Sequence, residues 1–325
     1  MSAIVHGAYG AAPEDVLRLE EIAKPTIAAD QVLVRVRAAS VDRGTWHIMA
    51  GLPYPIRVAG FGLHKPKHLN PGRSLAGTVE SVGNHVTGLK PGDEVFGICP
   101  GSFAEYVALR PDKLALKPSN VSFNEAAAVP ISGLAALQAV RDHGAVEAGQ
   151  KVLIVGASGG VGSFAVQIAK AYGAEVTGVC STAKLDLVRG LGADHVIDYS
   201  QEDFTDGQHH YDVILDIGGN RRLSHLRRAL TPKGRLVIVG GETDGRWLGG
   251  TDRQLRAQVL SIFVRQKLGT FVTSENAADL VALRELIEAG QVKPAINRTY
   301  PLSEVATAIR DLINGHARGK IVITV

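Results

Sequence analysis

A glycine-rich stretch is the strongest chemical signal in the chain: positions 156–162 read Gly-Ala-Ser-Gly-Gly-Val-Gly. It lies between an apolar run at 151–155, typical of a strand buried on both faces, and a helical pattern that starts at Val161. Such a junction needs glycine to bind a dinucleotide, because the turn is tight, the backbone approaches the pyrophosphate and the helix packs closely on the strand.

Amides at the start of that helix would bind the phosphates. The alternative is an ordinary glycine turn, but the strand before the glycines and the helix after them both favour a nucleotide site. The predicted cofactor contacts are Ser158, Gly159, Gly160 and Val161, together with Gly240 in the later stretch GRLVIVGG.

The residues about 20 positions after the glycines indicate which dinucleotide fits. Residues 179–184 read Val-Cys-Ser-Thr-Ala-Lys, and the first carboxylate is Asp186. A carboxylate would bind a free ribose 2′-hydroxyl and repel a 2′-phosphate, whereas the Ser181 hydroxyl and the Lys184 ammonium would hold that phosphate. The pattern favours NADP(H) over NAD(H). The alternative is that Ser181 caps a helix and Lys184 is a solvated helix residue.

A parallel sheet is needed to position these residues. From about Ser122 onward, strand patterns at 151–155, 175–181, 195–199 and 211–219 alternate with helical patterns, which is typical of a parallel sheet covered by helices. The first 120 or so residues show short β-rich runs between Gly and Pro turns, typical of a compact and mostly antiparallel β unit. The sequence therefore predicts an α/β protein with a β-rich first unit.

Composition narrows the function classes. The chain has 325 residues, 45% hydrophobic and 21% charged, with a formal net charge of +3. That charge is too small to indicate nucleic acid or a membrane surface as a partner, so a small molecule is expected instead. The two cysteines, Cys99 and Cys180, form no metal-ligand spacing, and we find no targeting segment or membrane span. We expect a cytoplasmic protein.

Several motifs in a fixed order resemble the medium-chain dehydrogenase/reductase superfamily, in its zinc-independent quinone oxidoreductase-like branch. They are PGRSLAGTVESVG, KPGDEVFG, PISGLAALQAV, ASGGVG, LGADHVIDY and GHARGKIVITV, and they span nearly the whole chain. The resemblance implies a GroES-like catalytic domain at 1–121, completed by 295–325, and a doubly wound Rossmann domain that binds NADP at 122–294. It places the adenosine-phosphate contacts on Ser181, Lys184 and Tyr199. It also implies a homodimer, since relatives often pair through the Rossmann sheet edge.

The zinc-dependent relatives carry residues that this chain lacks. They have a catalytic Cys near the start of the stretch equivalent to SVDRGTW and a His-Glu pair where this chain has Arg73-Ser74. The remaining histidine pairs, His64 with His68 and His209 with His210, lie in polar stretches that are typical of solvated loops. We expect no metal.

The missing zinc indicates the type of substrate. Zinc stabilises the full negative charge that forms on a simple ketone when hydride is added. A conjugated enone or quinone needs this less, because its charge is delocalised over an enolate. The resemblance implies the same activity, NADPH-dependent reduction of quinones or α,β-unsaturated carbonyls.

Catalytic side chains are harder to identify. Asp42 stands where the family usually has Asn, and it could act on the substrate or pair with Arg43 or a backbone amide. Tyr54 could donate a proton from its phenol, or it could be an ordinary loop aromatic. Because no proton donor is evident, the alternative function is a non-catalytic binding protein that senses NADPH on the same fold.

Overall fold

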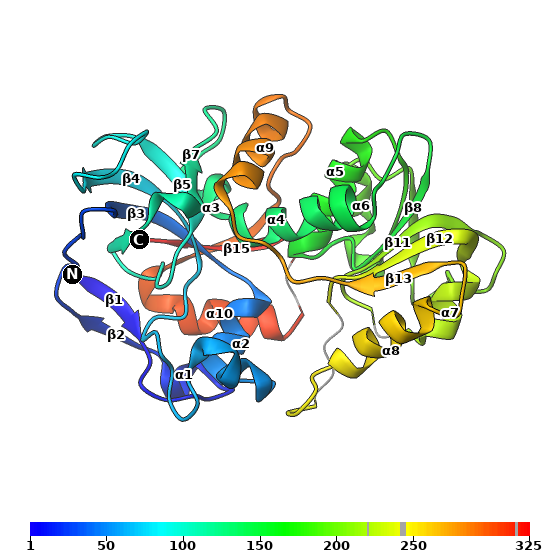
Figure 1. Ribbon diagram of the computed structural model, residues 1–325, viewed down its shortest axis with the longest axis horizontal. Coiled ribbons are helices and arrows are strands. Elements are labelled where there is room, and N and C mark those ends of the chain that lie inside the picture. Colours follow the sequence, from blue (N-terminus) through cyan, green and yellow to red (C-terminus); the bar gives the residue numbers. More distant parts are fainter. Residues whose placement is uncertain (220, 241–244, 316–317) are drawn as a thin grey trace. The chain divides into compact units, whose positions relative to one another are not determined.

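The computed structural model describes residues 1–219, 221–240, 245–315 and 318–325, and its contacts divide the chain into two units (Figure 1). Unit 1 comprises Met1–Ser132, Glu275–Glu288 and Pro294–Val325, and unit 2 comprises Gly133–Ser274 and Ala289–Lys293. The sequence predicts boundaries after residues 121 and 294, and the contacts add residues 122–132, 275–288 and 294 to the first unit. The predicted class, an α/β fold with a GroES-like unit and a Rossmann unit, is confirmed.

Unit 1 is built on a seven-stranded, mostly antiparallel sheet. Its strand order is β14 (Ile296–Pro301), β15 (Lys320–Thr324), β3 (Val32–Val41), β4 (Ser74–Val82), β5 (Glu94–Ile98) and β7 (Leu114–Leu116), with β6 (Tyr106–Leu109) also paired to β3. Among the described strand pairs of this sheet, β14 and β15 run parallel to each other, and the other pairs are antiparallel. The carboxyl-terminal strand β15 thus completes a sheet begun by the first third of the chain, as the family resemblance implied.

Short elements surround this sheet. A separate hairpin pairs β1 (Ser2–Val5) with β2 (Arg18–Glu21). The helices of unit 1 are α1 (Pro13–Val16), α2 (Arg43–Ala50), α3 (Phe123–Ala127), α9 (Ala277–Glu288) and α10 (Val305–Ile313). One apolar cluster joins Ala39 and Val41 of β3 to Ile309 of α10, and another joins Val34 to Val95. The two clusters therefore pack on opposite faces of β3, which is buried along its length except at Arg35 and Arg37.

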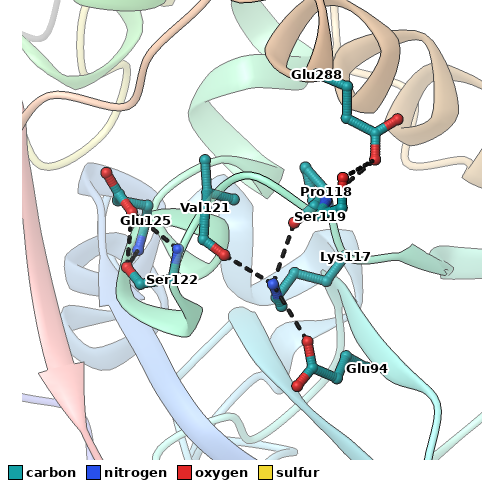
Figure 2. Close-up of polar contacts among 8 residues, drawn as sticks. All are labelled: Glu94, Lys117, Pro118, Ser119, Val121, Ser122, Glu125 and Glu288. Carbon is teal, nitrogen blue, oxygen red and sulfur yellow. Dashed lines mark hydrogen bonds and ion pairs between the residues drawn. The ribbon is translucent and has the colours of Figure 1, made fainter.

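A buried lysine fixes the chain where it leaves the β-rich part of unit 1 (Figure 2). The Lys117 ammonium donates to two main-chain carbonyl oxygens, at 3.1 and 2.7 Å, and lies 3.2 Å from a carboxylate oxygen of Glu94. Five residues on, Ser122 and Glu125 form a reciprocal capping box at the start of α3. These bonds define the turn between β7 and α3.

Unit 2 has a six-stranded sheet in which all neighbours run parallel. The strand order is β10 (His195–Asp198), β9 (Glu175–Cys180), β8 (Lys151–Val155), β11 (Tyr211–Asp216), β12 (Leu230–Ile238) and β13 (Lys267–Thr270). This is the doubly wound order, which reverses between β8 and β11 and places a ligand crevice at the carboxyl ends of those strands.

The helices of unit 2 are α5 (Gly160–Ala171), α6 (Leu185–Gly190), α7 (Leu223–Arg228) and α8 (Thr251–Ser261), while α4 (Pro130–Gln138) begins in unit 1. Residues 152–155 of β8 are all buried, as a central parallel strand requires. None of the helices in the described part of the chain is long and apolar enough to cross a membrane.

Candidate functional site

The glycine loop lies where the sequence predicted, between β8 and α5. Gly156 has φ +84°, a left-handed conformation that glycine adopts without strain. Gly162 packs so closely that a Cβ there would lie 2.1 Å from the Gly156 carbonyl oxygen. Gly160, Val161 and Gly162 form the first turn of α5, whose amides have no acceptor within the helix. The loop therefore presents amides at the positive end of a helix dipole, the arrangement that binds phosphate.

Ser181, Lys184 and Tyr199 come together at the carboxyl ends of β9 and β10. The two strands are parallel neighbours in which Cys180 pairs with Asp198, so Ser181 and Tyr199 follow at the same level. The Tyr199 amide donates to the Cys180 carbonyl at 3.2 Å, and Ser181 precedes the turn Thr182–Lys184. The carboxyl-terminal edge of the sheet thus carries a hydroxyl, an ammonium and an exposed phenol beside the glycine loop.

Asp198 is a carboxylate at this edge that the sequence reasoning did not single out. It is the last residue of β10, the third strand of unit 2, whereas a ribose-binding acid is expected at the end of the second strand, β9. Its oxygens accept hydrogen bonds from the hydroxyls of Thr182 and Ser200, the latter at 2.7 Å. These bonds, chiefly the one from Thr182, lower the pKa of Asp198. Asp198 therefore anchors the turn that carries Lys184.

Gly240 lies two residues beyond the carboxyl end of β12. Its amide donates to the Asp216 carbonyl at 3.3 Å, and a Cβ at this position would lie 2.3 Å from the Ile217 carbonyl oxygen. The close approach of these two backbone segments explains the glycine. Residues 241–244, which follow it, lie outside the described part of the chain.

A buried ion pair supports the crevice at the end of β11. Asp216 is fully buried and contacts the guanidinium of Arg253 in α8. Arg253 also donates to the main-chain carbonyls of Gly219 and Arg221, at 3.2 and 3.1 Å. Burial raises the pKa of Asp216 to about 6, although Arg253 opposes the shift. The pair holds the segment that follows β11 against α8.

The raised pKa predicts a pH-dependent contribution to stability. An Asp with a pKa near 6 when folded and 3.8 when unfolded stabilises the folded state most at acidic pH, and this contribution is lost as pH rises through 6. Between pH 5 and 7.5 the loss is about 1 kcal/mol. We therefore expect the stability of the wild type minus that of Asp216→Asn to fall by this amount over that range. Urea unfolding at both pH values measures it, and a pH-independent difference would contradict the assignment.

Unit 1 contains a cavity of about 280 Å³ whose wall is partly apolar and partly charged. Asn70 shapes its floor by accepting from the Gly72 amide at 3.0 Å and donating to the Phe103 carbonyl at 2.8 Å. The residues that line this cavity include Ile48, Phe61, His68, Arg73, Ile98, Cys99, Lys113 and Glu275.

Three charged side chains meet in this cavity. A guanidinium nitrogen of Arg73 contacts one oxygen of Glu275, and the Lys113 ammonium lies 2.8 Å from the other oxygen. Burial, with Lys67 and Arg73 nearby, lowers the pKa of His68. Arg73 is therefore an ion-pairing residue of this cavity.

The described residues contain no group of three or more His, Cys, Asp or Glu side chains that could hold a metal ion. Cys99 and Cys180 are both free and buried. Burial raises the pKa of each thiol, which disfavours the thiolate form that a nucleophile requires.

Asp42 lies at the amino end of α2 and is buried. Its Oδ1 accepts from the Thr45 amide at 3.0 Å, so it caps the helix, while Oδ2 has no hydrogen-bond partner among the described residues. Lys320 of β15 is also buried and donates to the Val41 carbonyl at 3.1 Å. Burial lowers the pKa of Lys320, and the nearby Asp42 opposes this shift. The structural alternative for Asp42, a bond to a backbone amide, is thus realised; catalysis by Asp42 stays a prediction.

Tyr54 faces an arginine. The Arg57 guanidinium carbon lies 5.0 Å from the centre of the Tyr54 ring and 4.4 Å from that of Tyr9. Tyr54 is not one of the residues that line the cavity of unit 1. Its proposed proton donation also stays a prediction.

Known proteins resemble this chain over both units. Residues 28–119 match the family described as alcohol dehydrogenase GroES-like domain, and residues 191–323 match the one described as zinc-binding dehydrogenase. A 2-methylene-furan-3-one reductase from Solanum lycopersicum is 35% identical over 325 residues, covering 95% of this chain and 76% of the relative. An NADPH-dependent alkenal/one oxidoreductase from Arabidopsis thaliana is also 35% identical, covering 99% of this chain and 79% of the relative.

The chain also resembles solved structures over its whole length. A quinone oxidoreductase from Coxiella burnetii has a TM-score of 0.85 and 29% identity, and the match covers 100% of this chain and 99% of that chain. The relatives and the shared fold agree with the motifs found in the sequence. The chain therefore belongs to the medium-chain dehydrogenase/reductase superfamily, in its quinone oxidoreductase-like branch.

Proposed function

We propose that this member of an oxidoreductase family is an NADPH-dependent reductase of conjugated carbonyl compounds, either quinones or α,β-unsaturated ketones and aldehydes. The observation that carries the proposal is the edge of unit 2, where a glycine loop at a helix start lies beside Ser181, Lys184 and Tyr199. The names of the relatives support the substrate class, since they include alkenal/one and quinone oxidoreductases.

Unit 2 would hold the cofactor through its own residues. The amides of Gly160 and Val161 would bind the pyrophosphate, and Ser181, Lys184 and Tyr199 would bind the 2′-phosphate. The loop fits a phosphate because Gly162 allows the closest packing of helix and strand. When bound, the cofactor supplies a hydride. The protein positions the acceptor, excludes water and stabilises the charge that develops on the acceptor oxygen.

Reduction without zinc is part of this proposal. Arg73 and Ser74 occupy the positions of the His-Glu pair, and the stretch equivalent to the one that carries the catalytic Cys reads SVDRGTW, without a cysteine. A conjugated acceptor suits such a site, because the electron pair displaced by the hydride is delocalised. The enolate formed from an enone is then protonated at carbon, and the anion formed from a quinone is protonated at oxygen. We also propose a reducing compartment such as the cytoplasm, where free cysteines are expected.

The second candidate is an NADPH-sensing protein without turnover. It is favoured by the contacts of Asp42, which caps α2, and of Tyr54, which faces Arg57. Absorbance at 340 nm separates the two functions. We expect NADPH oxidation with enones or quinones and no NADP⁺ reduction with simple alcohols. Tight NADPH binding with no turnover on any conjugated acceptor would support the sensor instead.

We further propose that unit 2 forms a homodimer interface. Strand β13 is the last strand of the described sheet, and α8 packs against it. Along α8 and the turn after it, Leu255, Val259, Ile262 and Phe263 repeat at helical spacing and are each more than half exposed. A second copy would bury this face and the sheet edge together. Light scattering should give twice the 34.3 kDa chain mass, and a monomer at micromolar concentration would contradict the proposal.

A further inference from the structure

The cavity of unit 1 carries an excess of positive charge. Its lining includes two permanent cations, Arg73 and Lys113, and a single carboxylate, Glu275. Burial and the neighbouring cations lower the pKa of His68, which disfavours a further positive charge on its imidazole. The cavity as a whole is therefore positive, which favours an anionic occupant over a neutral one.

The Arg73 guanidinium has more N–H donors than its contact with Glu275 uses. A guanidinium carries five N–H groups, and among the described residues Glu275 is the acceptor that Arg73 contacts. Glu275 does not depend on Arg73 alone, since Lys113 holds its second oxygen at 2.8 Å. Arg73 can thus keep its ion pair and still bind a carboxylate in the cavity through its remaining N–H groups.

The backbone around Arg73 is fixed before any ligand binds. Its carbonyl accepts from the Cys99 amide at 2.8 Å, and the Gly72 amide donates to the Asn70 side chain at 3.0 Å. Gly72 packs so tightly that a Cβ there would lie 2.5 Å from the Ser102 hydroxyl oxygen. This backbone and the ion pair with Glu275 restrain the two ends of the Arg73 side chain, which lowers the entropy cost of binding a ligand to its guanidinium.

The rest of the wall suits an apolar body. Ile48, Phe61 and Ile98 line the same cavity as the charged group. We propose that Arg73 is a specificity-determining residue that selects acceptors bearing a carboxylate on an apolar skeleton. This inference rests on the proposed function for the reaction itself, while the selection of an anion by Arg73 is a binding property that can be measured without turnover.

The test compares one acceptor in two forms, a straight-chain enone with a terminal carboxylate and its methyl ester. We expect the wild type to prefer the acid at least tenfold in kcat/KM. Arg73→Gln should lose that preference, so that its ratio of kcat/KM for the acid to kcat/KM for the ester falls to about one, and Arg73→Lys should restore part of the preference. In Arg73→Gln the Glu275 carboxylate stays paired with Lys113 at 2.8 Å, so this variant leaves no lone charge in the cavity. If it does not fold, the comparison of acid with ester is made with Arg73→Lys alone.

Calorimetric binding of the saturated acid and its ester gives the same comparison without catalysis. If neither enone is reduced but the acid still binds through Arg73, the proposed reaction fails and the present inference holds. If the wild type reduces or binds the acid and the ester equally, or if Arg73→Gln leaves the ratio unchanged, the inference is overturned.

Discussion

Replacing Lys184 with glutamine is expected to lower kcat/KM for NADPH about 30-fold and to leave kcat/KM for NADH within threefold. A charge-assisted hydrogen bond contributes about 2 kcal/mol, and every 1.4 kcal/mol is about tenfold in affinity. Lys184 ends the turn after β9, beside Ser181 and close to the carboxyl end of β10. A ribose with a free 2′-hydroxyl does not need the ammonium, so the loss should be specific to NADPH.

Steady-state kinetics with both cofactors measures this ratio. Lys233→Gln is a matched control, because Lys233 is an exposed lysine of the same unit on β12. It should leave both values unchanged. An equal loss for NADPH and NADH, or an unchanged ratio in Lys184→Gln, would remove Lys184 from the phosphate site.

Gly162→Ala is expected to destabilise the protein by about 3 kcal/mol and to weaken NADPH binding at least 100-fold. The added Cβ would lie 2.1 Å from the Gly156 carbonyl oxygen and 2.8 Å from the Ala157 Cα, and both are backbone atoms of the loop itself. Helix α5 would have to move away from the turn, which displaces the amides that bind phosphate.

Urea unfolding and fluorescence titration with NADPH measure these two effects. Gly190→Ala is the control, since a Cβ there meets nothing within 4 Å and its φ is not positive. It should be neutral or slightly stabilising. If Gly162→Ala binds NADPH as the wild type does, the glycine loop is not the phosphate site.

Local sequence patterns were enough to predict the edge of the unit 2 sheet that carries the candidate nucleotide-binding residues. The strand before the glycines and the helix after them could be identified within about 20 residues of sequence, and Ser181 and Tyr199 each follow a strand. Parallel pairing of β9 with β10 then brings them to the same edge. The fold class is confirmed for the same reason, because alternating strands and helices leave few arrangements other than a parallel sheet.

Local sequence patterns do not predict contacts between residues that are far apart in the chain. Arg73 and Glu275 are 202 residues apart, and Asp216 and Arg253 are 37 apart, so nothing local in the chain links either pair. Asp198 could not be predicted in this way, because it ends β10, whereas the pattern for a ribose-binding acid concerns β9, the next strand after the glycine loop. These charged contacts form because the fold brings distant segments together, and local sequence patterns do not predict which segments meet.

The central claim is hydride transfer to a conjugated carbon without a metal. An enone incubated with NADPH deuterated at C4, with a metal chelator present, should give NADP⁺ and a saturated ketone in equal amounts. The deuterium, located by NMR, should lie on the carbon β to the carbonyl. Deuterium on the carbonyl carbon of an allylic alcohol, or turnover that the chelator abolishes, would contradict the account.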